Sequence, residues 1–417
     1  MKIFDPKDYI RGLQQILIND KKRIGFLFGA GISIGAGIPA VDGLTKKIIN
    51  NFSDEPKFQN AIQEIESEIS ADKFNIESLL SNVLQKKQII AEGKLNGLDK
   101  LGFSDLETAI KKGIISEFSI HTSDGFSVSD LAHTAFANWI SSVNRIYPIE
   151  LFTTNNDVLL ELAMEEESLP FYDGFSGSYE PFFDEASVED MKFLPHWTKL
   201  WKIHGSLGWK EVVNGKKVIR KNEGKNIDVA NTLIYPSVLK YEESRKLPYV
   251  SLIDRLKNFI KQEDTILFTC GYSFGDEHIN NVILNALKES SSSHIIAFFY
   301  DKMDSGTDRS YALSEEHPVV KIAKGSNRIS VYACRNAVIG CRYGRWQLIT
   351  EPDKKDTIDI NCYYDEDAPV LDVLGKPAEG KKIWSGEGEL TLPDFSKLVE
   401  FLQYMIPEIS VGKYEDE

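Results

Sequence analysis

The sequence predicts an α/β fold with helices on both faces of a largely parallel sheet, and three observations lead to this prediction. The apolar runs are short and continuous rather than alternating, which is typical of strands buried on both faces. Helical stripes, such as that over 276–288, lie between these runs. A glycine-rich turn follows the first run, at 24–28. Strand and helix in alternation favour a doubly wound, Rossmann-like sheet. The other predicted strands are 149–153, 200–203, 232–235, 265–270, 294–300 and 328–332.

The glycine-rich turn is the most distinctive stretch of the chain. It runs from Gly29 to Pro39 and reads G-A-G-I-S-I-G-A-G-I-P. Missing Cβ atoms let a backbone approach phosphates, and the N-terminus of the following helix offers N–H donors and the positive end of its dipole. The spacing differs from the G-x-G-x-x-G of ordinary dinucleotide sites. We therefore predict a dinucleotide site of a less common kind behind the first strand.

Helical patterns define the predicted domain organisation. A short helix over 7–20 precedes the first strand, and a charged, helical block over about 45–147 is interpreted as an insertion within a domain that spans 1–345. The segment 346–417 is rich in Asp, Lys, Pro and Gly before its last helix. We predict that it forms a small C-terminal appendage used for packing or assembly.

Composition excludes several classes of partner. The 417 residues carry 48 Lys and Arg against 63 Asp and Glu, a formal net charge of −15. So acidic a surface repels a phosphate backbone, and direct nucleic-acid binding is not expected. No apolar run reaches the roughly 18 residues of a membrane helix, and the N-terminus lacks the regions of a signal peptide. We therefore expect a cytoplasmic protein that does not contact membranes.

The cysteines argue against a metal module. Cys270, Cys334, Cys341 and Cys362 are scattered along the chain, and none belongs to a C-x-x-C pair. Paired cysteines at short spacing are the usual ligands of structural zinc. Neither a zinc ribbon nor a disulfide framework is therefore expected.

Three polar motifs follow predicted strands, where open α/β sheets build their sites. Residues 153–157 read T-T-N-N-D, residues 204–205 read H-G, and residues 271–276 read G-Y-S-F-G-D. Taken singly, each has a structural explanation. Asn or Asp after a strand is commonly a helix N-cap, the role we expect for Asp276, and a lone histidine is more commonly structural. Their order behind the strands of one sheet favours a joint site.

In this order the motifs resemble those of the sirtuin family. Segment 29–39 is similar to the sirtuin loop G-A-G-x-S-x-x-A-G-I-P, and 153–157 is similar to T-Q-N-x-D with Thr154 in place of Gln. The pair 204–205 matches the family's H-G, and 271–273 is similar to its G-T-S. The resemblance covers about residues 20–305.

Two departures separate the chain from protein-deacylating sirtuins. Those enzymes carry a zinc module with two C-x-x-C pairs, which this chain lacks, and they continue G-I-P with D-F-R, where this chain has A-V-D-G at 40–43. The helical insertion, 233–236 (L-I-Y-P) and 271–280 instead resemble sirtuin-like domains of bacterial antiphage defence, a group that hydrolyses NAD.

The resemblance implies an NAD glycohydrolase that takes NAD as its substrate, releases ADP-ribose and nicotinamide, and depletes NAD in abortive infection. It implies that Asn155 orients the attacking water and a ribose hydroxyl, and that Asp157 holds the nicotinamide amide or its pocket. It also implies that His204 is a general base toward a ribose hydroxyl or the water. The residues implied to bind NAD are Gly29, Ala30, Gly31, Ser33, Pro39, Thr154, Gly271 and Ser273. No zinc is expected.

Two other functions stay open at this point. One is an NAD-dependent deacylase or ADP-ribosyltransferase, and the missing cysteine pairs argue against a deacylase. The other is a regulatory subunit that senses NAD or an ADP-ribose derivative, and the presence of Asn155 and His204 argues against it. Because an NADase is toxic it must be restrained, so we expect a homo-oligomer. The resemblance adds a HerA-type ATPase or another defence protein as a candidate partner.

Overall fold

A computed structural model describes residues 1–71, 73–212, 217–221, 232–234, 247–305, 308–353, 356–367 and 384–406. Tyr235 and Pro236 of the L-I-Y-P motif lie outside the described residues. Among the helices of the described ranges, none is long and apolar enough to cross a membrane.

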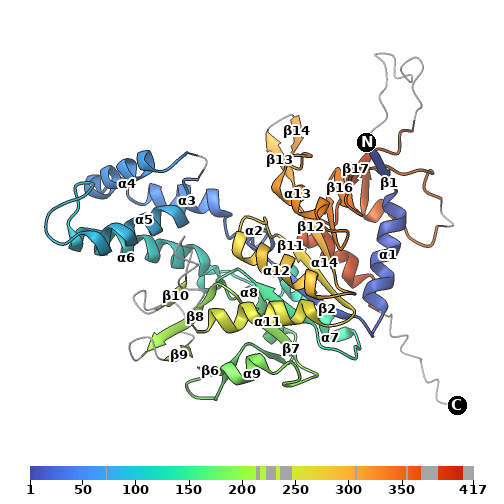
Figure 1. The fold of residues 1–417 in the computed structure, drawn as a ribbon, viewed down its shortest axis with the longest axis horizontal. Helices are drawn as coiled ribbons and strands as arrows, with labels where there is room; N and C mark the ends of the chain where they lie inside the picture. Colours follow the sequence, from blue (N-terminus) through green and yellow to red (C-terminus); the bar gives the residue numbers. More distant parts are fainter. Residues whose placement is uncertain are drawn as a thin grey trace.

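A ten-stranded sheet forms the centre of the molecule (Figure 1). From β15 to β4 every neighbouring pair is parallel, whereas β16 runs antiparallel to both of its neighbours. In spatial order the strands are β1 (Lys2–Phe4), β17 (Arg342–Trp346), β16 (Asn336–Ile339), β15 (Ile329–Ala333), β12 (His294–Phe299), β11 (Thr265–Cys270), β2 (Arg23–Phe28), β3 (Glu150–Thr153), β7 (Thr198–Lys202) and β4 (Phe171–Tyr172).

The strand order confirms the predicted fold class. Numbered along the chain, the run β7-β3-β2-β11-β12-β15 is 3-2-1-4-5-6, the order of a doubly wound Rossmann sheet. Its strands are the continuous apolar runs of the sequence, and β2, β3, β7, β11 and β15 are buried along all or nearly all of their length. Such burial needs helices on both faces.

Two hydrophobic clusters mark the two faces of the sheet. Alternate residues of β2 divide between them, with Phe26 and Phe28 in one cluster and Leu27 in the other. The helices of the first face are α1 (Pro6–Ile18), α7 (Ala132–Ser142), α8 (Leu159–Glu166) and α14 (Phe395–Gln403). Those of the second face are α11 (Tyr249–Lys261), α12 (Glu277–Glu289) and α13 (Pro318–Lys324).

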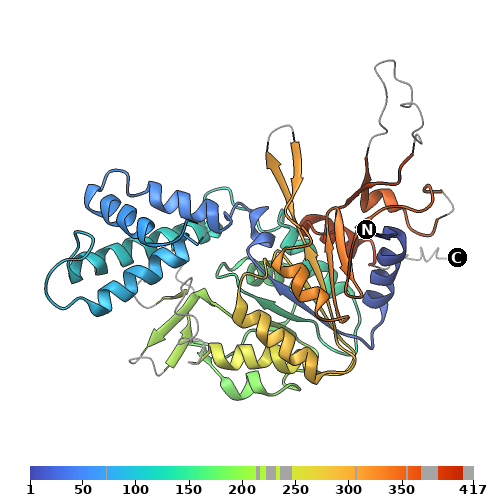
Figure 2. The same ribbon diagram turned by 45° about the horizontal axis from the view of Figure 1, so that its top comes forward.

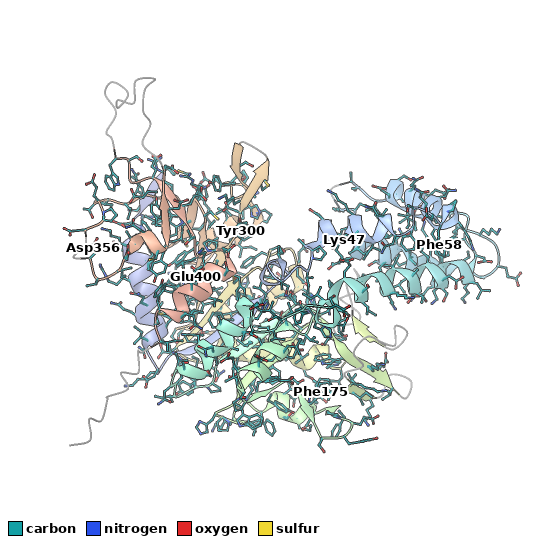
Figure 3. The ribbon with its side chains drawn as sticks, turned by 180° about the vertical axis from the view of Figure 1, so that it is seen from behind. Lys47, Phe58, Phe175, Tyr300, Asp356 and Glu400 are labelled. Carbon is teal, nitrogen blue, oxygen red and sulfur yellow. The ribbon has the colours of Figure 1, made fainter. Side chains whose placement is uncertain are left out.

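A helical lobe stands to one side of the sheet (Figures 1 and 2). It has a hydrophobic cluster of its own, built mainly from α3 (Val41–Asn50), α4 (Pro56–Glu68), α5 (Ile76–Ile89) and α6 (Lys100–Phe118). In Figure 3 the labelled Lys47 and Phe58 lie in this lobe, well apart from the labelled Glu400 of α14. The chain returns through η1 (Ile120–Thr122) to α7, which packs on the sheet through Phe136 and Trp139.

A smaller antiparallel sheet follows β7. Its strand order is β10 (Thr232–Ile234), β8 (Gly205–Val212), β9 (Lys217–Arg220), β6 (Phe182–Phe183) and β5 (Phe175–Ser176), with α9 (Glu185–Glu189) beside β6 in the chain. Residues 232–234 of the run predicted at 232–235 therefore form a strand, but in this sheet and not in the parallel one. A short apolar run predicts a strand and carries no information about its partner.

The C-terminal region is part of the main structure. α14 buries Leu398, Phe401 and Leu402 in the same cluster as Phe28 and Phe136 of β2 and α7. The remaining elements are α2 (Gly31–Ile34), the projecting hairpin of β13 (Lys302–Ser305) and β14 (Asp308–Tyr311), η2 (Ile360–Cys362), and the pair β18 (Tyr364–Glu366) and β19 (Gly388–Leu390).

Candidate functional site

The four motifs of the sequence meet at one edge of the large sheet. They follow β2, β3, β7 and β11, which are neighbours in the order β7-β3-β2-β11 and run parallel. Carboxyl ends of parallel strands lie on the same edge. The chain winds to one side of β2 through β3 and to the other through β11, so this is the topological switch point, where such sheets bind ligands.

Glycines join the loop after β2 to the loop after β11. The Gly31 N–H donates to the Gly271 carbonyl at 3.1 Å. A Cβ on Gly31 would lie 2.5 Å from Gly271 Cα, and one on Gly29 would lie 2.5 Å from the Gly271 carbonyl oxygen. Gly271 itself has φ +65°, the left-handed region that favours glycine. These three glycines are therefore required for contact between two backbones.

This contact changes the role expected for the glycine-rich turn. The N–H groups of Gly29 and Ser33 donate to the carbonyls of Cys270 and Ala30, at 3.2 and 3.1 Å. With the Gly31 bond, three of the N–H groups expected to face a phosphate are used within the protein. Around Gly35 and Gly37, by contrast, an added Cβ would meet nothing within 4 Å, so the open part of the turn lies there.

Asn155, Ser33 and Asp157 form a buried hydrogen-bonded chain. The Asn155 Nδ2 donates to the Gly29 carbonyl at 3.1 Å and to Ser33 Oγ at 3.0 Å. The Ser33 hydroxyl donates to Asp157 Oδ2 at 2.9 Å, and Asp157 Oδ1 accepts from the Leu159 N–H at 3.1 Å. Both amide hydrogens of Asn155 are used, so this side chain offers only Oδ1 to a further molecule.

His204 is the second residue of the two-residue turn between β7 and β8, and it faces Asp276. Its Nε2 lies 3.2 Å from Asp276 Oδ2, and both side chains are largely buried. The His204 carbonyl accepts from Asn156 Nδ2 at 2.8 Å, which ties this turn to the loop after β3. Asp276 is the N-cap of α12, as predicted, and accepts from the N–H groups of His278 and Ile279. No motif in the sequence indicates its contact with His204.

The four loops thus contact one another in a closed circuit around the ends of β2 and β3, each loop bonded to the next. Ser33 joins the β2 loop to the β3 loop, and Asn156 joins the β3 loop to the β7 turn. His204 meets Asp276 of the β11 loop, which returns to the β2 loop through Gly271. Because β7 and β11 are three positions apart in the sheet, the His204–Asp276 contact crosses about 14 Å of strand spacing.

Three ionisable side chains near Asp157, those of Lys202, Glu161 and His133, are not predicted by the sequence analysis. The Lys202 ammonium donates to the Asp157 carbonyl and pairs with Glu161 Oε1 at 2.7 Å. Burial raises the pKa of Glu161. His133 is buried, and neither ring nitrogen has a hydrogen-bond partner among the described residues. Burial lowers its pKa to about 4 despite the charge of Asp157. No spacing or motif marks these residues in the sequence.

Four other residues implied to bind NAD lie at the margins of this circuit. The Thr154 N–H donates to the Phe28 carbonyl at 3.0 Å and so holds the end of β3 to β2. Ala30 and Ser273 are exposed, and the Ser273 hydroxyl accepts from the Gly275 N–H at 3.2 Å. Pro39 is half-buried just before α3. Within the described ranges, no three His, Cys, Asp or Glu residues are grouped as metal ligands.

A comparison with protein families finds a match that includes part of this edge. Residues 149–319 match the family model described as the SIR2-like domain. This segment, less than half of the chain, is similar to SIR2-like domains. The match begins at β3 and ends in α13, so it includes Asn155, His204 and Asp276 and excludes the glycine-rich turn of β2.

Solved structures similar to this chain include two Sir2 proteins. One is a Sir2 homologue in complex with NAD, at 15% identity, 69% coverage of this chain, 81% coverage of that chain and a TM-score of 0.36. The other comes from work on the mechanism and regulation of Sir2 enzymes, at 15% identity, 70% and 85% coverage and a TM-score of 0.33. Among curated proteins, none matches the sequence. The strand order establishes the fold of this chain independently of these similarities.

Proposed function

We propose that this protein is an NAD glycohydrolase, which cleaves NAD with water to ADP-ribose and nicotinamide. The observation that carries the proposal is the meeting of Asn155, Asp157 and His204 at the switch point of a doubly wound sheet, on loops bonded to one another. These are the residues that the sirtuin resemblance implies for holding and cleaving NAD. The SIR2-like match of residues 149–319 supports the same choice of nucleotide.

The reaction needs three contributions from the protein. The C1′–N bond to nicotinamide breaks as the ribose gains oxocarbenium character, and the electron pair leaves with neutral nicotinamide. A water oxygen bonds to C1′ and loses a proton. Asn155 Oδ1 accepts from this water and fixes its position, His204 takes the proton and passes it to solvent, and Asp157 holds the nicotinamide amide.

Two features of the sequence favour hydrolysis over deacylation. The sequence lacks the two C-x-x-C pairs of the deacylating enzymes and departs from them at 40–43. These features do not support a channel for acyl-lysine peptides like that of the deacylases. Transfer to a protein, rather than to water, would use the same bond cleavage and differs only in the acceptor.

Product analysis of purified protein tests the proposal. The wild type is incubated with NAD, alone and with cell lysate, and nicotinamide, ADP-ribose and acetyl-ADP-ribose are separated by chromatography. We expect nicotinamide and ADP-ribose in equal amounts. Asn155→Ala and His204→Ala are each expected to lower the rate by about 10²–10⁴-fold while the protein stays folded. Full turnover by both variants would show that the site is wrong.

We also propose a biological setting and a form of control. The resemblance to antiphage sirtuin-like domains supports NAD depletion in the cytoplasm on infection, by a homo-oligomer or with a HerA-type ATPase. Cells carrying the wild type should lose NAD after infection, and cells carrying His204→Ala should keep it. A purified monomer with constant full activity would contradict restraint by assembly.

A further inference from the structure

We infer that Asp276 is the positioning residue of His204: it accepts from Nε2–H and so directs the Nδ1 lone pair toward the reacting water. This inference deepens the proposed hydrolysis and rests on it. It starts from the 3.2 Å contact between His204 Nε2 and Asp276 Oδ2. A carboxylate accepts hydrogen bonds and cannot donate one, so at this distance a neutral ring is favoured to carry its hydrogen on Nε2, facing Asp276.

The loop after β11 is built to hold Asp276 in place. The Tyr272 hydroxyl donates to Asn280 Oδ1 at 3.0 Å, and Asn280 Nδ2 donates to the Phe274 carbonyl at 2.8 Å. Gly271 and Phe274 both have positive φ, at +65° and +58°. The conformation of the loop is therefore fixed from the end of β11 to the first turn of α12.

The two oxygens of Asp276 have separate partners. Oδ1 accepts from the N–H groups of His278 and Ile279 at 3.0 and 3.1 Å, which completes the N-cap of α12. Oδ2 lies toward His204. Capping uses one oxygen and needs no residue from another strand. Oδ2 instead contacts His204, which follows β7, three positions from β11 in the sheet. Capping alone does not account for this geometry.

The contact with Asp276 decides which nitrogen of His204 holds the proton at each stage of the reaction. Neutral His204 donates Nε2–H to Asp276 and accepts the water proton at Nδ1. The imidazolium that forms then carries a hydrogen on each nitrogen, and the nearby carboxylate offsets its charge. The proton leaves from Nδ1 to solvent, and the starting tautomer is restored. Asp276 keeps its charge throughout.

Asp276→Asn separates capping from positioning. Asn is as good an N-cap as Asp, so Oδ1 can still accept from α12. Its Nδ2 then faces His204 and donates to Nε2, which selects the opposite tautomer and places the hydrogen on Nδ1. We expect kcat to fall by up to about 10⁴-fold, the size seen when the orienting Asp of a serine protease becomes Asn. KM and the melting temperature should stay near those of the wild type.

The tautomer is read directly from ¹⁵N-histidine-labelled protein, with His204→Ala used to assign the signals. The wild type should show His204 with hydrogen on Nε2, and Asp276→Asn should show it on Nδ1. Asp99→Asn is the matched control, because Asp99 caps α6 in the helical lobe through the Gly102 N–H; it should change neither tautomer nor rate.

The tautomer of His204 and the release of nicotinamide test the inference and the proposed function separately. If the tautomer changes as stated but the wild type releases no nicotinamide, the hydrolase proposal fails and the positioning contact stands. If the wild type cleaves NAD while Asp276→Asn keeps the same tautomer or the same kcat, the inference is overturned.

Discussion

Gly31 and Gly271 hold two loops against each other at the carboxyl ends of β2 and β11. Their Cα atoms approach so closely that a Cβ on either would overlap the other's backbone. Gly35, four positions along the same turn, has open space around it and φ −62°. The glycines of one motif therefore have different physical roles, and residue exchange can separate them.

Gly31→Ala and Gly35→Ala form a matched pair. An added methyl group on Gly31 must move the Gly271 backbone, so the free energy of unfolding should fall by about 1–3 kcal/mol, with a loss of NAD cleavage. Gly35→Ala should keep or raise stability by up to about 1 kcal/mol, because Ala restricts the unfolded chain. Urea denaturation of both variants measures this difference. Equal stabilities would contradict the close contact.

At the scale of elements, α14 closes the first face of the sheet. It lies against α7, and its Phe395 ring packs on Phe28 of β2 and on His133. The sequence predicts an amphipathic helix at this place but not its neighbour. The last described helix is thus part of the core that supports the ends of β2 and β3.

Leu402→Ala tests this placement. Leu402 is fully buried in the main cluster, and truncation of a buried Leu costs about 2–5 kcal/mol. Glu400→Ala is the control in the same helix, since Glu400 is exposed and pairs with exposed Lys397; it should change stability by about 0.5 kcal/mol or less. Thermal and urea unfolding give both values. A Leu402→Ala protein as stable as the wild type would show that α14 is not docked as described.

At the scale of the whole molecule, one buried histidine and three half-buried ones couple folding to pH. The pKa values of His121, His133, His294 and His317 are all lowered, with burial as the largest cause. A lowered pKa means that the unfolded chain binds the proton more readily than the folded one. Stability from this source is complete above the unfolded pKa near 6.5 and is lost as the pH falls below it.

His133 dominates this effect, because its pKa is lowered to about 4. Between pH 6.5 and 4 its contribution should fall by about 3 kcal/mol. His133→Leu removes the titrating group and should flatten the pH dependence of the free energy of unfolding in this range. The exposed His196→Leu is the control and should leave the slope unchanged. An unchanged slope for His133→Leu would contradict its burial as a neutral ring.

Much of the fold could be predicted because it depends on local patterns. Continuous apolar runs located β3, β7, β11, β12 and β15 to within a residue or two, and the stripe over 276–288 located α12 (Glu277–Glu289). Pairing was harder to predict, since the run at 232–235 is as apolar as the others and joins the antiparallel sheet. The candidate site divides in the same way: the motifs mark where side chains follow strands, and their roles toward NAD stay predictions.

The sequence by itself determined that a glycine-rich turn and three polar motifs follow four buried strands, because apolar runs and glycine placement are properties of neighbouring residues. Only the tertiary structure decided that β2 lies between β3 and β11, so that Gly31 meets Gly271 and Ser33 lies between Asn155 and Asp157. It also decided that His204 meets Asp276, although 72 positions separate them. Strand order brings such residues together through space, and no local pattern in the chain encodes which strands become neighbours.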